Sequence, residues 1–122
     1  MLIRIDETGR AYEVKKVPYG NNFMKWINLI DPPDYAEICT YIDEKINKQD
    51  KYSVATLFGG NWDDPLFRIY TAMNEDSYNS ALLLGRINLD RVIKSEAQWF
   101  CTKTNLNGRD LSTAFYWRKS GV

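Results

Sequence analysis

Two adjacent carboxylates, Asp63 and Asp64, lie in the stretch TLFGGNWDDPLFRIY and could hold a hard divalent ion or act as a general acid and base. Gly59 and Gly60 let the backbone approach a ligand closely, and Trp62 could serve as a platform for it. Neighbouring side chains point in different directions, however, and an aspartate before a proline is a common turn former. We therefore weigh two interpretations of the Gly59–Asp64 loop: a turn, and a ligand or metal loop formed by Trp62, Asp63 and Asp64.

The chain contains no histidine, and this restricts its chemistry. Serine and cysteine nucleophiles activated by an imidazole are excluded, as are the usual zinc sites. Cys39 and Cys101 stand apart in the sequence, which is typical of buried thiols in a reduced compartment. We find no catalytic motif and predict no cofactor and no resident metal, so the prediction leans against an enzyme.

A second group of candidates combines flat rings with cations near the C-terminus. Asn107-Gly108 is a strong signal for a β-hairpin, and we expect strands on both sides of it. Alternation along these strands places Trp99, Lys103, Tyr116 and Arg118 on one face, with Arg109 nearby, and Phe100, Phe115 and Trp117 on the other. We expect the second face to enter the core and the first to face water.

An exposed surface of tryptophan, tyrosine and basic residues is typical of sites that bind other proteins. The leading prediction is therefore a non-enzymatic interaction protein whose partner-binding residues are Trp99, Lys103, Arg109, Tyr116 and Arg118. One alternative is a single-stranded nucleic-acid binder, because rings can stack on bases and cations can hold phosphates. We also weigh a metal-dependent or carboxylate-based enzyme that uses the Gly59–Asp64 loop, an ordinary amphipathic ribbon, and a homo-oligomer.

Several elements can be predicted around these candidates. An N-terminal hairpin turns at Thr8-Gly9 and places Ile5 opposite Tyr12. A helix over residues 32–48 begins after Asp31, and its apolar residues recur every three or four positions. Residues 51–58 alternate as a strand. Residues 65–73 fit either a strand or a helix, with the strand favoured, and residues 77–96 fit two helical pieces separated at Gly85.

These elements predict one α+β domain over residues 1–122, with a mainly antiparallel sheet of five or six strands packed against one long helix and one or two short ones. Lysines and arginines number 16, as do aspartates and glutamates, so the net charge is zero. Neutrality argues against non-specific DNA binding as the main function. Without a signal peptide or a long apolar run, we expect a cytoplasmic, bacterial protein that does not enter a membrane.

Overall fold

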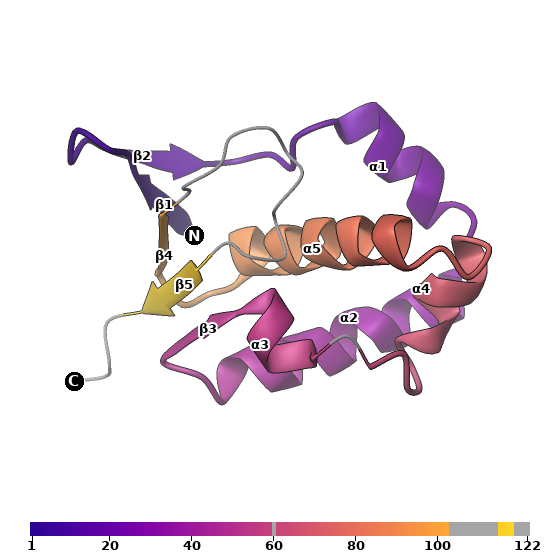
Figure 1. Ribbon diagram of the computed structural model, residues 1–122. Helices are drawn as coiled ribbons and strands as arrows, with labels where there is room; N and C mark the ends of the chain where they lie inside the picture. The colour runs from indigo at the N-terminus through magenta and orange to yellow at the C-terminus, as the bar shows by residue number, and fades with distance from the viewer. Residues whose placement is uncertain (60, 103–114, 119–122) are drawn as a thin grey trace.

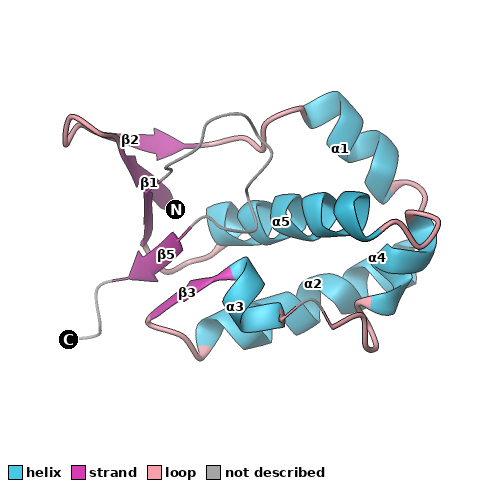
Figure 2. Cartoon of the chain, in the orientation of Figure 1, coloured by secondary structure: helices cyan, strands magenta, loops and turns pink. Residues whose placement is uncertain are grey.

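The computed structural model describes residues 1–59, 61–102 and 115–118. Its elements, in chain order, are β1 (Leu2–Ile5), β2 (Ala11–Val14), α1 (Gly20–Ile27), α2 (Pro32–Asn47), β3 (Lys51–Ser53), α3 (Val54–Phe58), α4 (Phe67–Ala72), α5 (Ser77–Lys94), β4 (Trp99–Thr102) and β5 (Phe115–Arg118). The helices gather on one side of the strands (Figures 1 and 2). None of the described helices combines the length and apolarity needed to cross a bilayer.

The fold is α+β, but the sheet is mixed. Its five strands lie in the order β2-β1-β4-β5-β3. β1 pairs in parallel with β4, whereas the other neighbours pair antiparallel. The prediction of a mainly antiparallel sheet is therefore corrected, because the N-terminal hairpin joins the C-terminal ribbon side by side through β1. The prediction of one long helix is also wrong, since α2 and α5 are both long.

Helix α5 is the centre of the molecule. Residues 83–89 are buried without interruption, so this part of the helix is covered on every side. Its neighbours are α1, α2, α3 and α4, and its C-terminal half approaches the sheet (Figure 1). Gly85 lies in the middle of this continuous helix, which overturns the prediction of two pieces. Tertiary packing here outweighs the local helix-breaking tendency of glycine.

Helices replace parts of two predicted strands. The predicted strand over residues 51–58 ends at Ser53, whose hydroxyl accepts a hydrogen bond from the Thr56 amide at 3.2 Å and caps α3. Residues 67–72 form α4, so the preference for a strand over 65–73 is wrong. The apolar residues of this segment fitted both the two-residue period of a strand and the 3.6-residue period of a helix. Burial of Ile69 in the core is compatible with the helix. The helix predicted over 32–48 is confirmed as α2.

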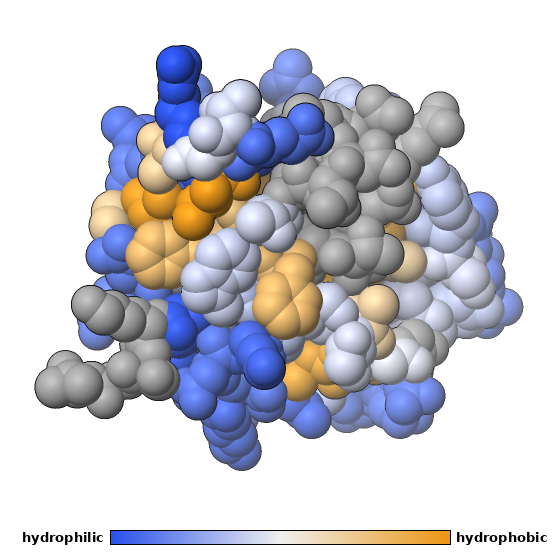
Figure 3. All heavy atoms as spheres, turned by 60° about the vertical axis from the view of Figure 1, so that its left-hand side comes forward, coloured by the Kyte–Doolittle hydropathy of each residue, from blue (hydrophilic) through white to orange (hydrophobic). Residues whose placement is uncertain are grey.

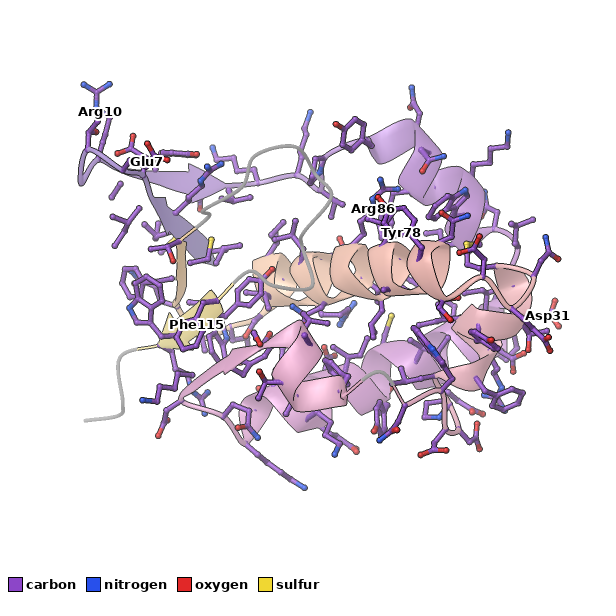
Figure 4. All side chains as sticks on the ribbon, viewed as in Figure 1. Glu7, Arg10, Asp31, Tyr78, Arg86 and Phe115 are labelled. Carbon is purple, nitrogen blue, oxygen red and sulfur yellow. The ribbon has the colours of Figure 1, made fainter. Side chains whose placement is uncertain are left out.

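An arginine docks α1 on α5. Arg86 is buried, and its guanidinium carbon lies 5.3 Å from the Tyr19 ring and 5.2 Å from the Trp26 ring. Its Nη1 donates a 2.6 Å hydrogen bond to Asn22 Oδ1. Figure 4 shows Arg86 projecting from α5 toward α1. Burial lowers the pKa of Arg86, and the two rings stabilise the cation where water cannot.

The β1–β2 turn sets the register of the first hairpin one residue away from the prediction. The amide of Asp6 donates to the carbonyl of Arg10 at 2.9 Å, which leaves three residues in the loop instead of two. Ile5 therefore pairs with Ala11, not with Tyr12. The Asp6 carboxylate holds the loop by accepting hydrogen bonds from the Thr8 amide, the Thr8 hydroxyl and the Arg10 amide.

These hydrogen bonds lower the pKa of Asp6, that of the Thr8 side chain most strongly. A lowered native pKa means that the ionised carboxylate stabilises the fold above its unfolded pKa and that this stabilisation is lost as pH falls through the native pKa. We expect Asp6→Asn to lower the free energy of unfolding at pH 7, with the deficit shrinking below pH 3.8. Urea unfolding at several pH values measures this deficit in the free energy of unfolding. Glu7→Gln, in the same turn, is the control. A deficit that does not change with pH would contradict the stabilising role assigned to the ionised Asp6 carboxylate.

A buried hydrogen bond ties the sheet to α5. Tyr52 on β3 donates to Asn88 Oδ1 on α5 at 2.9 Å, and both side chains are buried. We expect Tyr52→Phe to lower the free energy of unfolding by about 1 kcal/mol. Asn88→Ala should cost about 2 kcal/mol or more, because it leaves the Tyr52 hydroxyl without its acceptor. Chemical unfolding measures both variants, with Tyr78→Phe on the exposed start of α5 as the control; additive effects in the double variant would show that the two side chains do not interact.

Candidate functional site

The face predicted to meet water is buried. Trp99 is 0% exposed and Tyr116 is 1% exposed. Both rings pack on Tyr52, at centroid distances of 5.6 Å for Trp99 and 5.3 Å for Tyr116. The expectation that Trp99 and Tyr116 face water is therefore wrong. Burial removes two of the largest apolar side chains of the chain from solvent, which is a strong driving force for this orientation.

Arg118 closes the edge of that buried cluster. Its guanidinium carbon lies 5.1 Å from the Trp99 ring, and Nη2 donates a 2.8 Å hydrogen bond to the carbonyl of Asn47 at the end of α2. Its Nε lies 3.9 Å from a carboxylate oxygen of Asp50. Among the described residues, these contacts give Arg118 a structural role: it holds the end of β5 against α2. Lys103 and Arg109, the other two predicted cations, lie outside the described part of the chain.

Among the described residues no helix covers the opposite face of the sheet (Figure 2), and we call its large apolar side chains the outer face: Ile3, Ile5, Phe100, Phe115 and Trp117. Strand pairing aligns Ile3 with Phe100 and Phe100 with Trp117, so they form a row across β1, β4 and β5. The rings of Phe100 and Trp117 stack at 6.0 Å with an interplanar angle of 19°. Phe115 is 43% exposed, and the other four are partly exposed.

This face is apolar in its centre and charged at its borders. Figure 3 brings it forward and shows apolar (orange) side chains gathered there with hydrophilic (blue) ones around them. Lys51 borders it on β3 and Glu13 on β2, and these are the two edge strands. Glu7 and Arg10 project from the β1–β2 turn (Figure 4). An apolar centre within a charged rim is the usual anatomy of a protein-binding surface.

The strand alternation correctly grouped Phe100, Phe115 and Trp117 on one face, but it did not show which face is buried. Both faces of the C-terminal ribbon carry large rings, so hydrophobicity alone gives no preference. In the observed register Phe100 lies opposite Trp117, so both rings project from the same face. The leucines and isoleucines gathered over residues 82–93 are a signal of a central helix, but the sequence does not show which face of the ribbon that helix meets.

The Gly59–Asp64 loop is occupied by internal contacts, as far as the structure describes it; Gly60 lies outside the described residues. The Trp62 ring stacks on Tyr70 at 5.6 Å and lines an apolar cavity of about 310 Å³ between α3 and α5. Asp64 lies 3.8 Å from Arg68, which also pairs with Asp34 and Glu37 of α2. The backbone carbonyl of Asp63 accepts a hydrogen bond from the Phe67 amide at 3.1 Å.

The arrangement offers little to a metal ion or a nucleophile. Among the described residues, no three acidic or cysteine side chains come together where they could hold a metal. Burial raises the pKa of Cys39, so this thiol stays protonated at neutral pH and is a poor nucleophile.

Comparisons of the chain with protein-family models, with curated proteins and with solved structures find no match.

The two aspartates can be tested for metal binding directly. We expect Mg²⁺, Mn²⁺ and Ca²⁺ at millimolar concentrations to change neither the tryptophan fluorescence nor the melting temperature, because Asp64 lies beside Arg68 and Asp63 supplies at most one carboxylate. The Asp63→Asn/Asp64→Asn variant should behave identically in the titration. A saturable response that this variant abolishes would show that the loop binds an ion.

Proposed function

We propose that this chain is a cytosolic, non-enzymatic interaction protein that binds another protein through the outer face of its sheet. The observation that carries the proposal is the row of Ile3, Phe100 and Trp117 side chains across three strands, with Phe115 exposed beside it. Within the described residues, the helices pack on the other side of the sheet, so none of them covers this row (Figure 2). Contiguous apolar surface of this kind marks interaction sites more often than catalytic ones.

The stacked Phe100–Trp117 pair would supply most of the binding free energy. Large rings that are already held by their neighbours lose little conformational entropy when a partner covers them. Truncation of such an anchor commonly costs about 2 kcal/mol or more in binding free energy, about 30-fold in Kd. The charged residues at the border of the outer face would set the orientation of the partner and the specificity of binding, because charges at a rim add little affinity themselves.

The chemistry of the outer face indicates which kind of partner it can bind. Lys51 and Glu13 carry opposite charges at opposite edges of the sheet, so the border offers no single sign to attract a polyanion. We infer a partner protein with an apolar helix or strand face of similar width and charges of both signs around it. A nucleic acid would require a predominantly positive surface, whereas the described border of the outer face carries both signs, with Lys51 and Arg10 against Glu7 and Glu13.

A double variant on the outer face tests the proposal. Phe100→Ser/Trp117→Ser should keep a cooperative melting transition yet lose at least about tenfold in affinity for the partner, because the anchor rings are gone. The partner is found as the protein retained by immobilised wild type and not by this variant, and is then purified for titration calorimetry. Tyr78→Ser on α5 is the matched control, since it removes an exposed ring far from the sheet.

Equal retention of every protein by wild type and by Phe100→Ser/Trp117→Ser would overturn the proposal. Sedimentation of the purified chain adds a second outcome. A dimer that this double variant dissociates would identify the partner as a second copy of the chain.

A further inference from the structure

Besides the cavity beside Trp62, a hollow lies on the helix side of the sheet, away from the outer face. It has a volume of about 290 Å³, near the lower limit for small-molecule pockets. It is bounded by the inner side of the sheet, by the segment that follows β2 and by α5. Its lining includes Arg4, Tyr12, Lys16, Leu89, Cys101 and Tyr116.

The charged side chains in the described lining of this hollow have one sign. Arg4 and Lys16 are both positive, and no carboxylate belongs to its described lining. Among the described residues Arg4 forms no salt bridge. The Asp6 carboxylate accepts from Thr8 and from the Arg10 amide, and the longer-range attraction of Arg4 adds to these hydrogen bonds in lowering the pKa of Asp6. An anion would therefore be attracted by the described lining of this hollow.

Arg4 also has an unused donor. Its Nε is buried and has no hydrogen-bond acceptor within the described residues. Its guanidinium carbon lies 5.6 Å from the centre of the Tyr12 ring, which holds the group in place beside the hollow. A buried donor left unpaired is unfavourable, so an acceptor supplied by a ligand would be bound with a net gain. A carboxylate can accept from Arg in a bidentate geometry, which makes it the best match.

The rest of the described lining is mainly apolar, although it includes Thr102. Val14, Val17, Pro18 and Leu89 surround the hollow together with the Tyr116 ring. Burial raises the pKa of Tyr116, so its hydroxyl stays neutral and adds no negative charge. The hollow thus presents cations at one part of its wall and an apolar surface over the rest.

We propose that this hollow binds a small amphipathic carboxylate, with its apolar body among Val14, Val17 and Leu89 and its head group at Arg4 and Lys16. The residues involved lie on the inner side of the sheet, and the proposal does not depend on the outer face being a docking surface. Such a ligand would add a binding activity to the interaction function proposed above.

Octanoate is a suitable probe, with 1-octanol and octylamine as neutral and cationic analogues of equal length. We expect calorimetry to show one octanoate per chain, with tighter binding than for octanol and weaker or no binding for octylamine. In NMR spectra of labelled protein, octanoate should shift the amides of Leu89, Thr102 and Tyr116. Probe bound to the outer face would instead shift the amides of Ile3, Phe100 and Trp117.

Variants separate the cationic contacts from the apolar ones. Arg4→Met keeps much of the apolar length and removes the charge, and it should weaken octanoate binding at least about tenfold while leaving octanol binding unchanged. Lys16→Met, at an exposed position that tolerates substitution, should weaken it severalfold. Arg10→Met is the matched control in the nearby turn and should bind as wild type does.

Three results would overturn the proposal: no octanoate binding at millimolar concentration, equal affinity in Arg4→Met and Lys16→Met to that of wild type, or octylamine binding as tightly as octanoate. Phe100→Ser/Trp117→Ser should retain octanoate binding. The two proposals therefore fail independently.

Discussion

The burial of Trp99, Tyr116 and Tyr52 against the C-terminal half of α5 is the constraint on which the rest of the structure depends. These rings contact one another, and the Tyr52 hydroxyl is bonded to Asn88, so the sheet has one fixed face toward the helices. Arg118 then closes this cluster from the side and binds the end of α2. A small set of aromatic contacts thus joins three strands to two helices.

Strand geometry transmits this constraint to the other face. Successive side chains of a strand point to opposite sides, so placing Trp99 and Tyr116 inside places Phe100, Phe115 and Trp117 outside. The chain supplies no polar residues at these three outward positions, although an ordinary surface strand would carry them. The outer face therefore follows from two facts together: the inner rings occupy the core, and the outward positions are also aromatic.

Local signals predicted some elements and not others. The helix that begins after Asp31 could be predicted because Pro32 and the spacing of Ile38, Ile42 and Ile46 agree. Residues 54–58 and 67–72 were misassigned because short apolar segments fit both the helical and the strand period, and only their packing against α5 decides between them. The parallel pairing of β1 with β4 has no signal in either segment, since pairing over such a distance depends on the whole fold. The outer face was missed for a similar reason: Phe100, Phe115 and Trp117 were grouped correctly, but the sequence does not indicate which side meets α5.

The parallel pairing of β1 with β4 also bears on how the chain folds. Residues 2–5 lie beside residues 99–102, so the middle of the sheet joins segments from near the two ends of the sequence. Closing such a long loop costs entropy before its contacts return any stabilisation, and folds rich in distant contacts form slowly. During synthesis on the ribosome, the first hairpin must wait for β4 before it has a neighbour on its inner edge. The sheet, and with it both proposed binding surfaces, therefore cannot be complete before residues 99–118 have been synthesised.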